Sequence, residues 1–132
     1  MENDILCYLG QSYSHVDKEV REKRFKIACE ATAKLMNLGL NCYSPVINSH
    51  TLESTGLVPY GWSFWQKHDL PILKRCDLLL VLMFEGWETS KGLRSEIQCA
   101  TENNIPILYA QLSELNGNIL TVIKEKWWEG TF

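Results

Sequence analysis

The chain of 132 residues is long enough for one domain with a hydrophobic core, and its 45% hydrophobic and 22% charged residues are ordinary for a soluble globular protein. A formal net charge of −3 gives no general attraction to nucleic acid or anionic lipid, so we expect no duplex nucleic-acid partner. No apolar run approaches the roughly 20 residues of a membrane span, and the N-terminus lacks the basic start of a signal peptide. The five cysteines contain no Cys-x-x-Cys pair, so we expect buried thiols in the cytoplasm, with no metal site and no cofactor.

Short apolar segments alternate with segments of helical spacing along the chain. We interpret residues 4–10, 40–46, 78–84 and the end of 103–109 as strands. The helical segments are residues 17–38, those from 62 to 69, those from 90 onward, and 119–128. This alternation predicts an α/β fold with a doubly wound parallel sheet of four to five strands in three layers, formed by residues 1–132 as a single domain.

The first long helix, 17–38, has clear start and stop signals, with Asp17 as its cap and Gly39 just after its end. Its polar face interleaves Lys and Arg with Glu, which is typical of a solvated face with pairs four residues apart. The alternative is that Arg21 or Arg24 turns back toward an anion near the helix start.

Two connections draw attention because of their composition. Residues 10–15, which include Gly10 and Ser12, are rich in small and hydroxyl side chains that can face an anion at a helix start, although a plain connecting loop has the same composition. We interpret residues 47–61 as a long loop, with His50 as a polar loop residue. A loop of this length is often a lid or a specificity loop, and we expect that role here.

Aromatic residues open the next helix. Trp62 and Trp65 either pack this helix on the sheet or provide a flat wall for a heterocyclic base. Pro71 is expected to interrupt the helix, which leaves Asp69 at a kink or as a cap. Near the C-terminus, Trp127 and Trp128 are adjacent, so at least one is expected to cover a sheet edge or meet another subunit.

The central unit combines a strand, a short loop and a helix start. Its apolar run, 78–84, suits a strand buried on both faces, and Ser90 can cap the helix that follows. Ligands of open α/β proteins bind at this kind of strand end. Glu96 lies less than two turns into that helix, where a carboxylate suits glycosyl-transfer chemistry. The alternative is an exposed glutamate paired with a basic residue.

Several short motifs in this order resemble the nucleoside 2-deoxyribosyltransferase superfamily, and in particular the DUF1937-type proteins of bacteria and phages. The shared features are a Tyr-Leu-x-x-x-Tyr-Ser-His start, a Ser-Pro after the second strand, a Trp-x-x-Trp-x-x-x-Asp segment and a Ser-x-Gly-x-x-x-Glu-Ile helix start. In this chain they begin at Tyr8, Ser44, Trp62 and Ser90. The resemblance extends to about Tyr109.

The resemblance implies a flavodoxin-like fold, a small-molecule nucleoside or nucleotide ligand and a homo-oligomer. It implies that Glu96 is the nucleophile, that Asp69 contacts the base or moves its proton, and that Tyr8 orients the nucleophile. Ser90 would bind the sugar or a 5′-phosphate, with Gly92 allowing close backbone approach. The loop after Gly10 departs from the Gly-Ser-Ile-Arg type of the nucleotide hydrolase branch.

The expected function is therefore cleavage or transfer of an N-glycosidic bond. One alternative is a TIR-like NAD glycohydrolase, since TIR domains also place a glutamate six residues after a serine, although here Gly92 and Leu93 replace their Trp-Cys. A second alternative is a nucleotide-binding or sensor module without catalytic activity.

Overall fold

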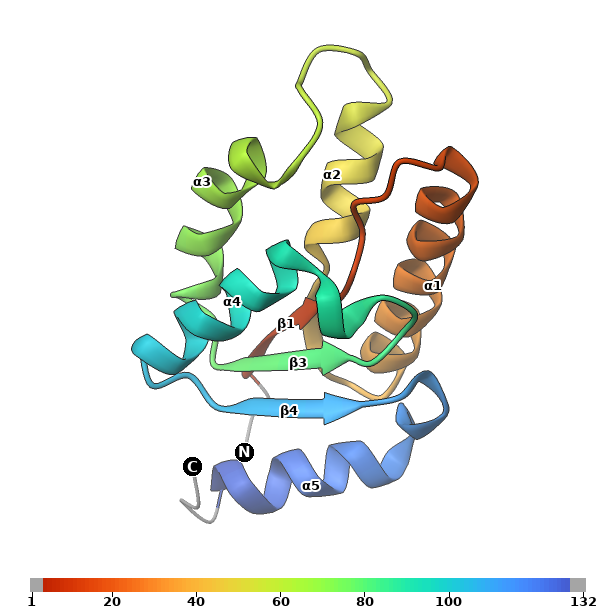
Figure 1. Cartoon of the computed structure of the whole chain (residues 1–132). Coiled ribbons are helices and arrows are strands. Elements are labelled where there is room, and N and C mark those ends of the chain that lie inside the picture. Colours follow the sequence, from red (N-terminus) through yellow and green to blue (C-terminus); the bar gives the residue numbers. More distant parts are fainter. Residues whose placement is uncertain (1–3, 129–132) are drawn as a thin grey trace.

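The computed structural model describes residues 4–128, with side chains described for residues 4–125. At its centre lies an all-parallel sheet of four strands in the order β2-β1-β3-β4 (Figure 1). The strands are β1 (Leu6–Gly10), β2 (Asn41–Tyr43), β3 (Leu78–Leu82) and β4 (Ile107–Ala110). The helices are α1 (Lys18–Asn37), α2 (Pro45–Glu53), α3 (Trp62–Leu73), α4 (Lys91–Glu102) and α5 (Gly117–Trp128).

Helices cover both faces of the sheet, so the predicted three-layer, flavodoxin-like α/β architecture is confirmed. On one face, Leu80 packs in a core with Leu35 of α1 and Ile123 of α5. On the other, Leu79 packs with Leu73 of α3 and Leu93 of α4. Every residue of β3 is buried, as the unbroken apolar run predicts for a strand covered on both faces. The side chains of Trp127 and Trp128 lie outside the described residues.

The order of the strands places a switch point between β1 and β3. Cys7 to Gly10 of β1 pair in register with Leu78 to Val81 of β3, while the chain continues from β1 to β2 on the opposite side. Connections from these two central strands therefore leave the sheet in opposite directions, which opens a crevice at their carboxyl ends. This crevice is where the functional side chains gather.

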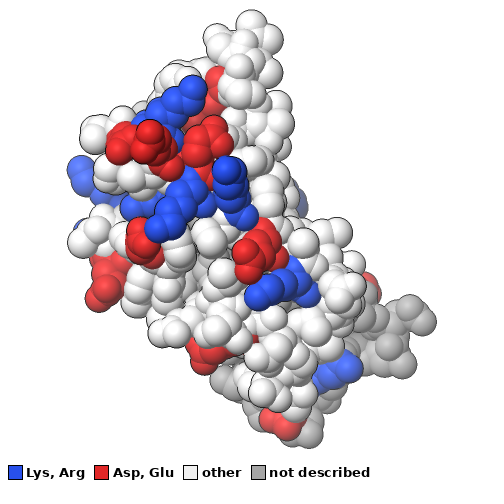
Figure 2. Space-filling model, turned by 90° about the vertical axis from the view of Figure 1, so that its right-hand side faces the viewer, with Lys and Arg blue, Asp and Glu red and all other residues white. Residues whose placement is uncertain are grey.

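The start and end of α1 agree with the sequence prediction. The carboxylate of Asp17 accepts a hydrogen bond from the N–H of Glu19 at 2.9 Å, and Gly39 follows the helix with a φ of 94°. Figure 2 shows the face around α1, where Lys and Arg are interspersed with Asp and Glu. Lys34 and Glu30 form one ion pair on this helix. Most of this face is thus a mixed, solvated surface, but Arg24 is an exception described below.

The predicted loop 47–61 is wrong over its first half, because residues 45–53 form α2. Ser44 caps this helix by accepting a hydrogen bond from the N–H of Ile47 at 3.3 Å, and Pro45 occupies the first turn. A serine followed by proline is a helix start, since proline lacks only an N–H that would have no partner there. Strand β2 accordingly ends at Tyr43, on the sheet edge, and His50 lies in a helix rather than a loop.

Pro71 does not interrupt α3, contrary to the prediction. It lies inside the helix, on its exposed side, where water can satisfy the carbonyl that loses its partner. Asp69 is therefore neither a cap nor a kink residue but a buried residue in the interior of α3. Among residues 4–128, no helix is long and apolar enough to cross a membrane.

Removing the cap of α2 tests the finding that residues 45–53 form a helix instead of the predicted loop. We expect Ser44→Ala to lower the free energy of unfolding by about 0.5–2 kcal/mol, because the Ile47 N–H loses its acceptor. Ser63→Ala, on the exposed first turn of α3, should change it by no more than about 0.5 kcal/mol. Urea denaturation of both variants checks this, and equal stability of the two would contradict the assigned cap.

Candidate active site

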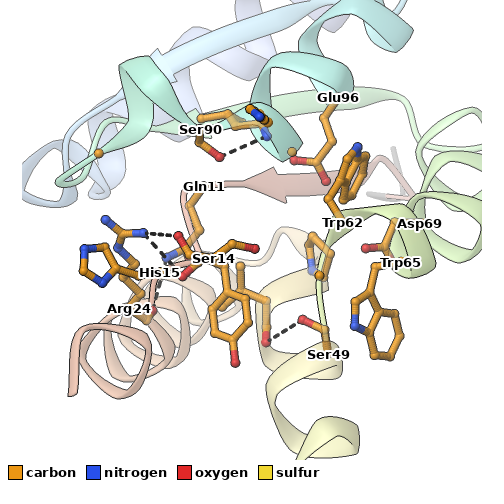
Figure 3. A pocket seen from close by; sticks show the side chains of 18 of the residues that line it. Gln11, Ser14, His15, Arg24, Ser49, Trp62, Trp65, Asp69, Ser90 and Glu96 are labelled. Carbon is orange, nitrogen blue, oxygen red and sulfur yellow. Dashed lines mark hydrogen bonds between the residues drawn. The ribbon is translucent and has the colours of Figure 1, made fainter. Parts of the chain in front are cut away.

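A cavity of about 460 Å³ opens at the carboxyl ends of β1 and β3 (Figure 3). Its walls come from the loop after β1, from α2, from the start and middle of α3, and from the loop and helix that follow β3. Figure 3 shows Arg24, His15 and Ser14 at one end and Trp62, Asp69 and Glu96 at the other. The two ends therefore differ in charge, one carrying the guanidinium of Arg24 and the other carrying two carboxyl groups.

The carboxylate end is built around Glu96. Ser90 accepts a hydrogen bond from the N–H of Leu93 at 3.2 Å and so caps α4, as predicted. Glu96, six residues later, points into the fold with only 3% of its surface exposed, and the hydroxyl of Tyr8 donates a hydrogen bond to its Oε2. The structure thus places Glu96 and Tyr8 in contact, and it excludes the alternative of an exposed, salt-bridged glutamate.

Burial changes the acidity of this group. Because the surrounding protein replaces water, the pKa of Glu96 rises to about 8, with the hydrogen bond from Tyr8 opposing the shift and the charge of Asp69 adding to it. Burial raises the pKa of Tyr8 well above its usual value, with Glu96 and Asp69 as further causes. Both carboxyl groups therefore act on the same tyrosine.

Asp69 lies near this pair. It is 3% exposed, and its Oδ1 is 3.0 Å from Nδ1 of His68. Burial raises its pKa, and the hydrogen bond to His68 lowers it. Both carboxyl groups therefore hold their protons more readily than in water, and neighbouring carboxyl groups with shifted pKa values are common at sites of acid–base chemistry.

Tyr43 belongs to the same cluster, although nothing singled it out in the sequence. It ends β2, lies opposite Tyr8 in the strand register, and its ring centroid is 5.7 Å from that of Tyr8. Burial raises its pKa, and Asp69 and Glu96 raise it further. Once β1 and β2 are paired, the register alone identifies Tyr43, but the sequence does not reveal that register.

Trp62 and Trp65 both line the cavity. A Cβ added at Gly92 would lie 3.3 Å from the ring of Trp62, so the glycine allows α4 to approach this indole closely. The Trp62 Nε1 is buried and has no hydrogen-bond partner in the described part of the chain. Trp65 is buried and donates its indole N–H to Glu53. Both aromatic predictions, packing and a flat cavity wall, fit this placement.

The two residues predicted in the loop after β1 lie behind the cavity rather than on its surface. Ser12 is fully buried, and its hydroxyl donates to the carbonyl of Glu85 at 2.6 Å, which ties the loop after β1 to the loop after β3. A Cβ added at Gly10 would lie 2.9 Å from Cδ1 of Leu93 and 3.5 Å from Oε1 of Glu96. Gly10 therefore lets α4 pack close to β1.

Arg24 of α1 supplies the buried cation of the cavity. Its Nη1 donates to the carbonyls of Tyr13 at 3.3 Å and Ser14 at 3.0 Å, whereas its Nε is buried without a partner. It is 8% exposed, and no carboxylate of the described residues pairs with it within 4.0 Å. Burial lowers the pKa of this guanidinium, while the charge of Glu85 raises it. Gly86, with a φ of 83°, leaves room for it.

Glu53 is a further buried carboxylate of the cavity. It was not predicted, because residues 47–61 were interpreted as a loop. Glu53, at the end of α2, is 3% exposed and lines the cavity. Its Oε2 accepts from Nε1 of Trp65 at 2.7 Å, and its Oε1 accepts from the hydroxyl of Tyr13 at 3.3 Å. The helical spacing of the buried residues Val46, Ser49 and Glu53 was the available signal.

No group of three or more His, Cys, Asp or Glu side chains within residues 4–128 is arranged to hold a metal ion. The family model described as "Domain of unknown function (DUF1937)" matches residues 6–111, which include all the strands and the whole cavity. None of the curated proteins matches the chain.

The raised pKa of Glu96 predicts a pH-dependent stability. The folded chain keeps this proton up to about pH 8, whereas an unfolded glutamate loses it near 4.5, so the folded state binds more protons between these values. Stability should therefore fall as pH rises through this window, by on the order of a few kcal/mol.

Urea denaturation from pH 5 to pH 9 measures this loss. In Glu96→Gln the loss should be much smaller, because the main titrating group is gone and only the contributions of Asp69 and, near pH 9, of buried thiols such as Cys7 and Cys76 remain. An identical pH slope in the wild type and the variant would contradict the assignment.

Proposed function

The chain belongs to the DUF1937 family, and for it we propose cleavage or transfer of the N-glycosidic bond of a (deoxy)nucleoside or nucleoside 5′-monophosphate. The observation that carries the proposal is the buried Glu96, hydrogen-bonded by Tyr8, at the floor of a cavity with indole walls. The resemblance to nucleoside 2-deoxyribosyltransferases rests on the same residues, with Asp69 and Ser90 in matching order.

The reaction needs a nucleophile and a proton donor. The carboxylate of Glu96 attacks the anomeric carbon while the carbon–nitrogen bond breaks, and the electron pair of that bond leaves with the base. Asp69 gives its proton to the departing base, which eases cleavage. The product is a glycosyl ester of Glu96, which water or a second base then opens, giving hydrolysis or transfer.

The electrostatics of the cluster support these roles. Positive charge develops on the sugar ring, and a carboxylate in a poorly solvated site stabilises that charge more strongly than it would in water. Tyr8 donates its hydrogen bond to Glu96, which favours the ionised form of the nucleophile. Burial still raises the pKa of Glu96 to about 8, so we expect activity to rise as the pH approaches 8 and the carboxylate forms. Burial favours the protonated form of Asp69, which suits a proton donor.

The cationic end of the cavity supports a phosphorylated ligand. Arg24 lacks an acidic partner in the described residues, His15 lies beside it (Figure 3), and Lys91 also lines the cavity. Ser90 and the first residues of α4 line the cavity, and a helix N-terminus favours an anion. A guanidinium that already holds the loop after β1 would place a phosphate with little rearrangement.

The roles of Glu96 and Tyr8 are testable by base release and base exchange with deoxynucleosides, their 5′-monophosphates and free acceptor bases. Glu96→Gln should lower kcat by at least roughly 10³-fold, because no covalent intermediate can form. Tyr8→Phe should lower it roughly 10- to 100-fold, as expected for loss of a hydrogen bond to a charged group.

Glu102→Gln, which changes an exposed carboxylate on the same helix, is the matched control and should keep wild-type activity. Undiminished activity of Glu96→Gln would refute the proposed nucleophile. Nicotinamide release from NAD by the wild type would favour the TIR-like alternative, and nucleotide binding without turnover would favour a binding module.

The role of Arg24 is tested by comparing a nucleoside with its 5′-monophosphate. Arg24→Met should raise the KM of the monophosphate roughly 10- to 100-fold and leave that of the nucleoside unchanged, because only the phosphate meets the guanidinium. Lys26→Met, at an exposed position of α1, serves as the control for a simple loss of charge. Equal effects on both ligands would show that Arg24 only maintains the fold.

A further inference from the structure

Glu53 is a buried carboxylate that the proposed chemistry does not use. It faces the cavity from the end of α2, on the side opposite to the helix that carries Glu96. It accepts hydrogen bonds from Nε1 of Trp65 at 2.7 Å and from the hydroxyl of Tyr13 at 3.3 Å. Trp65 and Tyr13 both act as hydrogen-bond donors, which suits a carboxylate because its oxygens can only accept.

This set of contacts leaves accepting capacity unused. A carboxylate has about four acceptor positions, and only two are occupied by the described residues. No Lys, Arg or His of the described residues pairs with Glu53 within 4.0 Å. Because unused acceptors of a buried charge are costly, the positions that face the cavity are suited to N–H donors of a ligand.

The surroundings of Glu53 indicate a flat ligand. Trp65 is only 5% exposed and already uses its N–H on Glu53, so the small part of it that lines the cavity is apolar. Trp65 and Asp69 are four residues apart on α3, which corresponds to about one helical turn, or 5.4 Å. Glu53, Trp65 and Asp69 line the same cavity, so a flat ligand that lies against Trp65 shares that space with both carboxyl groups.

Tyr13 and His50 fix the position of Glu53. The hydroxyl of Tyr13 is 2.7 Å from Nδ1 of His50, and its single proton is available to Glu53 when this nitrogen carries the hydrogen and donates it to the hydroxyl oxygen. The Nε2 of His50 is 3.1 Å from the carboxylate of Glu22. The His50 ring stacks on Phe25 at a centroid distance of 4.1 Å. A carboxylate held by such a chain is oriented before the ligand arrives, which favours selective recognition over a loose fit.

Building on the proposed function, we infer that Glu53 reads the base of the ligand and selects guanine. Guanine presents two adjacent donors, the ring N1–H and the 2-amino group, to one carboxylate. Hypoxanthine keeps the ring N–H but lacks the amino group. Adenine and cytosine present one amino group beside a ring acceptor, which would face the carboxylate unfavourably, and thymine has a single N–H between two carbonyls. Only guanine therefore fills two acceptor positions.

Binding is measured in the Glu96→Gln background, so that no ligand is consumed. Isothermal titration compares the 5′-monophosphates of deoxyguanosine, deoxyinosine and deoxyadenosine. The guanine nucleotide should bind roughly 10- to 100-fold more tightly than the hypoxanthine nucleotide, because only the former makes the second hydrogen bond to a charge. Adding Glu53→Gln should remove most of this difference, since an amide has one acceptor oxygen in place of two.

Two controls separate recognition from folding. Glu53→Gln keeps the shape of the side chain and an acceptor for Trp65, and circular dichroism and thermal unfolding check its fold. Tyr13→Phe retains the carboxylate of Glu53 but removes the hydroxyl group that orients it. The preference for guanine should therefore become smaller without disappearing.

The outcomes distinguish the two proposals. If nucleotides bind and are cleaved but the ranking of bases does not depend on Glu53, only the present inference fails. A preference for adenine that survives Glu53→Gln would likewise refute it. If no nucleotide binds and the wild type releases no base, the proposed function fails together with it.

Discussion

The close packing of α4 against the ends of β1 and β3 is the constraint on which the cavity depends. Leu93 meets the buried face of the sheet, and Gly10 leaves the space that this approach needs. With the helix held there, residue 96 faces inward, where its carboxylate meets Tyr8. The acid is thus buried because α4 is anchored on the hydrophobic core, and the position of the helix decides its chemistry.

Burial of three carboxylates near one cavity comes at an energetic cost. Glu96, Asp69 and Glu53 are each 3% exposed, and the described residues place no Lys or Arg beside them as an ion-pair partner. Two of them respond with a raised pKa, and the third is held by Trp65 and Tyr13. Natural proteins keep such costly groups at functional sites, because unmet charge is what a ligand satisfies.

The distribution of charge gives the cavity a direction. Arg24 lies at one end, and Trp62, Asp69 and Glu96 lie at the other (Figure 3). A ligand with an anionic group at one end and a heterocycle at the other matches this polarity. The walls of the cavity come from α1, α2, α3 and α4. Ligand recognition therefore depends on how these four helices are placed around the carboxyl ends of the strands.

Most of the helices and strands were predictable from patterns that extend over a few residues. The unbroken apolar run 78–84 predicted the central strand, and Asp17 and Ser90 predicted the starts of two helices. The alternation of strands with helices predicted a parallel sheet. Glu96, Tyr8, Asp69 and Ser90 were proposed as a set from the resemblance of their motifs to a known superfamily, and the structure brings Tyr8 and Glu96 into contact. The loop 47–61 was misread because Ser44 and Pro45 were interpreted as the end of a strand instead of the start of α2.

Sequence by itself determined the elements whose signals are local, since caps, periodicity and apolar runs act over a few residues. Tertiary structure alone decided which side chains meet: Tyr43 beside Tyr8, Arg24 without an acidic partner among the described residues, and Glu53 against the cavity. These contacts join residues far apart in the chain, and they depend on strand register and helix placement. Both are set by packing of the whole core, which no short stretch of sequence encodes.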